Sequence, residues 1–173
     1  MLKAIWAVIW TLRIALPKVA VGWMFALLTI DFNRVAMVEL GIAAIVVTAL
    51  LSIHYFMAPF QVVVGRIADT LPIFGYRRTP YLLLGSVVVS LLFLMLPSVA
   101  MGMGEGSALA FFSAIALFTL FGISMAVIAD TYHALIAEVT TPETRGMVIS
   151  VVWVVLIMST ILATVVMNSV RPE

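Results

Sequence analysis

Two histidines are the side chains of this sequence best suited to binding a metal ion. His54 lies near the middle of the apolar stretch 41–64, and His133 follows Asp130 by three residues in the stretch 107–135. A neutral imidazole is a common metal ligand, and a neighbouring carboxylate can orient its ring. The pattern predicts His54 and His133 as candidate ligands and Asp130 as an orienting partner. An interhelical hydrogen bond from His54 is the competing interpretation.

Other kinds of chemistry find no support in the residues. The chain has no cysteine, which excludes disulfides, thiolate metal sites and a cysteine nucleophile. It carries no glycine-rich phosphate loop and no plausible Ser-His-Asp site, so we expect no enzyme. The net charge of +1 leaves no basic patch, so we expect no nucleic-acid partner.

Composition indicates an all-α integral membrane protein. Hydrophobic residues make up 65% of the chain and charged residues 10%, with a mean hydropathy of +1.26, whereas soluble domains carry about 25% charged residues. About 20 apolar residues in a helix cross a bilayer. Five segments meet that length and predict a transmembrane bundle over residues 17–173: 17–37, 41–64, 80–99, 107–135 and 146–168.

Residues 1–16 form a separate apolar segment that contains Trp6 and Trp10. As a helix it would be too short to cross a bilayer, and tryptophans favour the headgroup level. We predict an interfacial helix here; the alternative is an extension of a tilted first span.

Charge placement predicts the orientation. Lys and Arg accumulate in cytoplasmic loops. One side of the predicted bundle holds seven basic residues: Lys3, Arg13, Lys18, Arg66, Arg77, Arg78 and Arg145. The other side holds Arg34 and Arg171. We therefore expect a cytoplasmic N-terminus and, after five spans, a C-terminus on the outside.

The loop between the second and third spans carries a distinctive set of residues. They are Gly65, Asp69, Gly75, Arg77 and Arg78. A carboxylate and two guanidiniums at opposite ends of a short loop can pair and fix the angle between the helices. The alternative is a solvated loop whose arginines set only the topology.

Two further intramembrane features stand out. Asp31 and Arg34 are three residues apart on the first span, so they share a helix face and can form a charge pair. Gly122 and Ala126 lie on the same face as Asp130, and small residues at this spacing allow close helix packing. Leu50, Met57 and Ala58 share a face with His54, and we expect them to supply a flat apolar surface beside a ligand of this histidine.

Three sequence blocks resemble a known family. They are Gly22–Gly41 with its Asn-Arg-Val and Val-Glu-Leu, His54–Pro80 with its Phe-Gly-Tyr-Arg-Arg-Thr-Pro, and Ala137–Gly146. Together they are similar to the bacteriochlorophyll-delivery branch (PucC/LhaA-like proteins) of the major facilitator superfamily. The resemblance implies most of the N-terminal six-helix half of a facilitator fold, with the C-terminal half missing.

The resemblance also implies a function. Such proteins assist assembly of light-harvesting complexes or handle their pigment, so His54 and His133 would face the magnesium of bacteriochlorophyll or chlorophyll, and a carotenoid is a further expected cofactor. Light-harvesting or photosystem polypeptides are the expected partners, and an intracytoplasmic or thylakoid-type inner membrane is the expected location. The alternatives are a structural subunit of a photosynthetic complex and half of a secondary transporter.

Overall fold

The computed structural model describes residues 2–57 and 59–170, and across them it contains helices and no strand. The elements are α1 (Leu2–Ala26), the π-helical segments η1 (Leu27–Phe32) and η2 (Val35–Glu39), α2 (Ala44–Phe56), α3 (Phe60–Thr70), α4 (Thr79–Gly104), α5 (Ala108–Val139) and α6 (Pro142–Val170). Four helical stretches in this part of the chain are long and apolar enough to cross a membrane. A fifth is added if α2 and α3 form one bent span.

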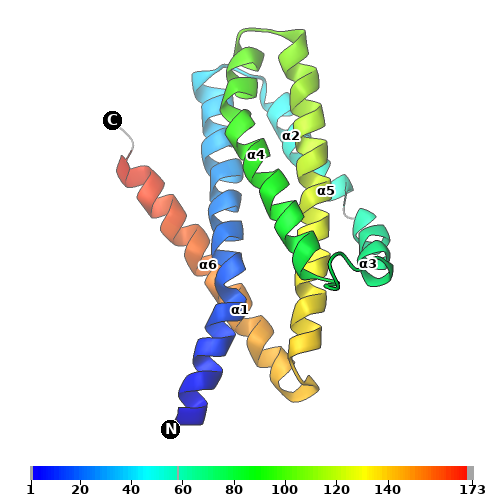
Figure 1. Cartoon of the computed structure of the whole chain (residues 1–173). Helices are drawn as coiled ribbons and strands as arrows, with labels where there is room; N and C mark the ends of the chain where they lie inside the picture. The colour runs from blue at the N-terminus through cyan, green and yellow to red at the C-terminus, as the bar shows by residue number, and fades with distance from the viewer. Residues whose placement is uncertain (1, 58, 171–173) are drawn as a thin grey trace. The chain divides into compact units, whose positions relative to one another are not determined.

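The chain divides into two compact units, of which the first contains residues 1–33 and 136–173. In it α1 and α6 pack against each other, and Figure 1 shows the two helices crossing. A Cβ atom on Gly22 would lie 2.8 Å from the carbonyl oxygen of Leu156, so the backbones approach closely. The Ser159 hydroxyl donates a hydrogen bond to the carbonyl of Val19 at 2.8 Å. Small residues and interhelical hydrogen bonds stabilise helix pairs in lipid, where hydrophobic burial contributes little.

Both helices of this unit bury residues at the same spacing of four, seven and four positions. The buried residues are Thr11, Ala15, Gly22 and Ala26 on α1 and Val148, Val152, Ser159 and Ala163 on α6. Most of these side chains are small, which explains how the helices come so close.

The expected boundary between an interfacial helix and the first span does not appear as a break. α1 runs through residues 16 and 17 without interruption, with Pro17 inside the helix. The apolar helix Trp6–Glu39 has 34 residues, or about 51 Å at roughly 1.5 Å per residue, against a hydrocarbon core of about 30 Å. Residues 2–16 therefore extend the first helix, and their depth in the membrane stays a prediction.

The second unit contains residues 34–135, with α2, α3, α4 and most of α5. Figure 1 shows α4 and α5 as a long hairpin joined by a short turn, in which Gly106 has a φ of +79°. A Cβ atom on Gly85 of α4 would lie 2.8 Å from the Ile128 side chain of α5. Phe118 and Val89 are among the fully buried side chains of the unit.

The predicted span 41–64 is divided in the structure. α2 ends at Phe56, α3 begins at Phe60, and the two helices are bent by 41°. Pro59 lies at the break, where its missing N–H and its ring disfavour a continuous helix. α3 continues to Thr70, six residues past the expected end of the span.

Candidate functional site

His54 lies half-buried near the end of α2, inside the second unit. Its Nδ1 forms a hydrogen bond with the carbonyl of Leu51. A carbonyl oxygen can only accept, so Nδ1 carries the proton and Nε2 carries the lone pair. A histidine that binds a metal typically donates a hydrogen bond from its other ring nitrogen, and this bond fixes the orientation of the ring. The ring also lies 3.9 Å from the Tyr55 ring and 6.1 Å from the Phe121 ring, measured between centroids.

Gly122 of α5 lies directly against the helix turn that carries His54. A Cβ atom on Gly122 would lie 2.8 Å from the His54 Cα and 2.8 Å from the Met57 Cγ. Ala126, one turn further along α5, is buried. Small side chains on this face of α5 thus bring α2 close enough to fix the backbone of His54.

The apolar surface expected beside His54 is not open. Leu50 is 3% exposed and belongs to the core, and Met57 packs against Gly122. Ala58 lies outside the described residues. The exposed apolar side chains next to His54 are Tyr55 and Phe56. Leu50 therefore does not contribute to an open apolar surface, and the expectation of such a surface at Ala58 stays a prediction.

Asp130 faces the second half of the broken span. A Cβ atom on Gly65 would lie 2.7 Å from the Asp130 Oδ2, so the missing side chain of Gly65 makes room for this carboxylate. The α5 face that holds Gly122, Ala126 and Asp130 therefore contacts first α2 and then α3. This face of α5 therefore packs against the chain on both sides of the break at Pro59.

His133 lies on an exposed face of α5, and its ring is edge-on to Tyr132 with centroids 6.0 Å apart. Orientation of His133 by Asp130 stays a prediction. The two histidines differ in setting, since His54 is packed among aromatic rings and His133 is at the surface of its unit.

The loop residues separate into two groups. Gly65 and Asp69 lie within α3, so the irregular segment is confined to residues 71–78. Gly65 therefore serves a close helix contact and not a turn. Gly75 has a φ of +81°, which a glycine adopts without strain. The pairing of Asp69 with Arg77 and Arg78 stays a prediction, because the structure does not describe the Asp69 side chain.

Arg34 forms an ion pair with Glu39 at 2.8 Å, a contact that the sequence pattern did not suggest. In an α-helix, residues three or four apart face each other. Here the backbone is π-helical, and the Leu40 N–H donates to the Val35 carbonyl five residues earlier at 2.9 Å. The wider turn brings residues five apart together. The predicted pairing of Arg34 with Asp31 stays a prediction.

Arg145 has a structural role beyond its charge. Its Nη2 donates to the Ala137 carbonyl at 3.0 Å, and its Nε donates to the Thr140 hydroxyl at 3.3 Å. It thereby satisfies groups at the C-terminal end of α5, where a cation is also favoured by the helix dipole. The feature of the sequence that could have predicted this contact is the Arg-Gly pair that closely follows the Thr-Thr-Pro-Glu turn.

A comparison with known protein families tests the family resemblance that the sequence motifs suggested. The family described as "PUCC protein" matches residues 31–171. The chain belongs to this family. A PucC protein of Cereibacter sphaeroides is 32% identical over 162 residues, which are 89% of this chain and 35% of that protein.

Two relatives from Rhodobacter capsulatus extend the PucC family comparison. One is named "Uncharacterized protein in puhA-bchM intergenic region" and is 35% identical over 150 residues, 83% of this chain and 31% of the relative. The other is named "Bacteriochlorophyll synthase 44.5 kDa chain" and is 27% identical over 149 residues, 84% of this chain and 33% of the relative. The chain therefore spans about a third of the length of these relatives. No solved structure matches it.

Proposed function

We propose that this chain is part of a membrane factor that assists assembly of a photosynthetic light-harvesting complex or handles its pigment. Family membership and the printed name of one relative, a bacteriochlorophyll synthase chain, support the link to pigment. The helices long enough to span a bilayer support a multi-pass position in a photosynthetic membrane. The proposal involves no catalysed reaction, and its partners are light-harvesting or photosystem polypeptides.

The observation that carries the pigment assignment is the hydrogen bond from His54 Nδ1 to the Leu51 carbonyl. It leaves Nε2 as the nitrogen that can bind the magnesium of a bacteriochlorophyll or chlorophyll, which needs an axial donor. The exposed Tyr55 offers an aromatic ring beside the imidazole, which suits a flat apolar ligand, and the buried Phe121 ring packs near the imidazole within the unit. His133 would serve as a second, more exposed ligand, and a carotenoid remains part of the proposal.

The major facilitator architecture belongs to the same proposal. The order of the motif residues supports it, since Gly65 and Asp69 lie within α3 and Arg77 and Arg78 directly precede α4. The chain would then supply most of one six-helix half, and the remaining length of the relatives would supply the other.

Replacement of His54 by Leu tests the pigment assignment. The chain, purified from pigment-containing membranes, should lose bound pigment by about tenfold or more, since even indirect partners of metal ligands are worth about 10–100-fold in affinity. Absorption per protein is the measurement. Ile45→Leu, which changes an exposed side chain on the same helix away from His54, is the matched control.

His133→Leu should lower the ratio of pigment to protein less than His54→Leu does, because water can replace the imidazole as a ligand at an exposed site. An unchanged absorption spectrum in the double variant His54→Leu/His133→Leu would remove both histidines from the mechanism. Protein–protein scaffolding would then be the better explanation for the role in assembly, through a surface other than the Gly122 and Ala126 face, which packs against α2.

A further inference from the structure

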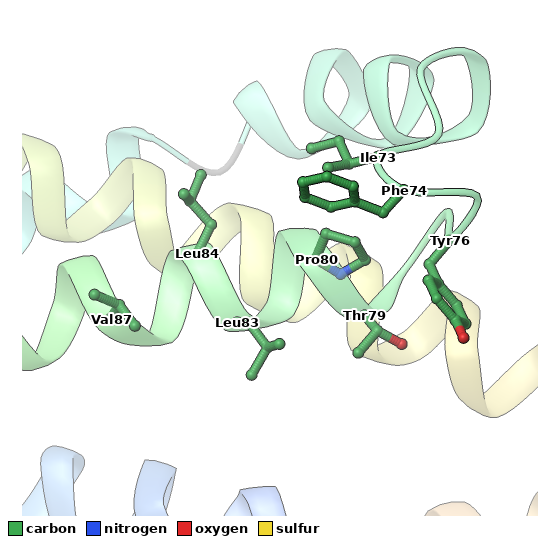
Figure 2. Close-up of a pocket in the computed structure, with 8 residues that line it drawn as sticks. All are labelled: Ile73, Phe74, Tyr76, Thr79, Pro80, Leu83, Leu84 and Val87. Carbon is green, nitrogen blue, oxygen red and sulfur yellow. The ribbon is translucent and has the colours of Figure 1, made fainter.

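An apolar groove lies between the segment that joins α3 to α4 and the first turns of α4 (Figure 2). Its volume is about 610 Å³, within the range of about 300–1,000 Å³ that is usual for small-ligand sites. Figure 2 shows Ile73 and Phe74 on one side of the groove and Pro80 and Leu84 on the other. The lining residues are Ile73, Phe74, Tyr76, Thr79, Pro80, Leu83, Leu84 and Val87.

The outer wall of the groove is a defined hairpin. Ile73 and Tyr76 exchange two backbone hydrogen bonds, of 3.1 and 3.0 Å. Phe74 and Gly75 between them have φ values of +53° and +81°, the pattern of a type I′ turn. This wall is therefore held in place by backbone bonds, independently of any ligand.

Phe74 is an unexpected residue at this position. Type I′ turns favour Asn, Asp or Gly, and a bulky side chain with positive φ is disfavoured. The Phe74 side chain is nevertheless 94% exposed, so no packing within the described protein compensates for the cost. Strained residues of this kind cluster at functional sites. An apolar ligand against the ring would supply the missing contact.

Two arginines are adjacent in sequence to residues that line the groove. Arg77 and Arg78 are the two residues between Tyr76 and Thr79, and both of those flanking residues line the groove. Arg77 is exposed, as is Arg66 on α3. Guanidinium groups suit phosphate better than ammonium groups do, because their donors form a planar fork. The other end of the groove, at Val87, is about 12 Å further along α4 at roughly 1.5 Å per residue.

We propose that this groove is a binding site for one acyl chain of an anionic phospholipid, with the lipid phosphate at the level of Arg77. α4 is long and apolar enough to span the bilayer, so a groove along its first turns runs from the interface into the hydrocarbon, as an acyl chain does. A bulk lipid touches one convex helix surface, whereas an acyl chain in this open groove would contact the helix on one side and the hairpin on the other. The site is independent of the pigment function proposed above.

Native mass spectrometry of the purified full chain tests the proposal. The protein is incubated in detergent with equal amounts of phosphatidylglycerol and phosphatidylcholine that carry the same acyl chains. We expect the phosphatidylglycerol adduct to exceed the phosphatidylcholine adduct several-fold. Leu84→Trp, which fills the groove, should lower both adducts several-fold, whereas Arg77→Gln should bring the two adducts to equal levels.

Matched controls separate this site from general lipid contact. Leu94 is 76% exposed on the same helix and does not line the groove, while Leu84 is 63% exposed within it. Leu94→Trp should therefore leave both adducts unchanged, and Arg13→Gln should leave the preference for phosphatidylglycerol unchanged. Circular dichroism checks that each variant is folded.

Three outcomes would overturn the proposal. The first is equal binding of the two lipids to the unmodified chain. The second is the same loss of adducts in Leu94→Trp as in Leu84→Trp. The third is stoichiometric displacement of bound phosphatidylglycerol by bacteriochlorophyll, which would assign the groove to the pigment's hydrocarbon tail.

Discussion

Gly22 shows how one residue can control the packing of two long helices. Its missing side chain leaves room for the backbone of α6, and an added Cβ atom would lie 2.8 Å from both the Leu156 oxygen and the Ser159 Cβ. Those atoms belong to the backbone or to a short side chain, so they cannot move aside easily. In lipid, such a close approach is a main source of helix association.

Gly22→Ala should therefore lower the free energy of unfolding by about 1–3 kcal/mol, the usual cost of overpacking. Reversible unfolding of the purified chain in mixed micelles is the measurement. Gly146→Ala is the matched control, because no atom lies within 4 Å of its added Cβ and Ala is the better helix former by about 1 kcal/mol. Equal stability of the two variants would contradict the close packing of α1 against α6.

At the scale of elements, α5 organises the second unit. One face of it contacts α2 through Gly122 and α3 at Gly65, on the two sides of the break at Pro59. Tyr81 of α4 adds a further contact, because its hydroxyl donates to the Leu71 carbonyl at the end of α3 at 2.7 Å. The bent segment is thus held from two neighbouring helices.

A double-mutant cycle between Gly65 and Asp130 tests the contact of α3 with α5. Gly65→Ala should destabilise the protein, since its Cβ atom would meet the Asp130 carboxylate. The same change should cost less in an Asp130→Ala background, where the carboxylate is gone. We expect a coupling energy of about 0.5–3 kcal/mol in unfolding measurements, as for residues in contact. Additive effects would place the two residues apart.

The orientation in the membrane is a property of the whole molecule, and the charge asymmetry predicts it. The absence of cysteine makes single-cysteine labelling straightforward. Arg77→Cys, in the loop before α4, should react with a membrane-impermeant maleimide only from the cytoplasmic side. Glu105→Cys, in the exposed turn after α4, should react only from the opposite side. Labelling of position 77 from the outside would reverse the predicted topology.

Much of the fold class was readable from composition and length alone. The predicted segments 80–99 and 146–168 lie within α4 and α6, and the segment 107–135 lies within α5 except for its first residue, Ser107. These helices are longer than the predicted segments, because residues beyond the apolar part of each segment also adopt a helical conformation. The loop motif and the Asn-Arg-Val block also pointed to the PucC family, which the comparison confirmed.

The sequence by itself determined the class of protein, the positions of the apolar helices and the family. Only the tertiary structure decided which faces meet: Gly22 with Ser159, Gly122 with His54, and Gly65 with Asp130. It also revealed the pairing of Arg34 with Glu39, which depends on a π-helical backbone. The physical reason is that helices in lipid are apolar on all sides, so hydrophobic periodicity does not mark the buried face. Close contacts between small residues define that face, and they emerge only when the helices pack.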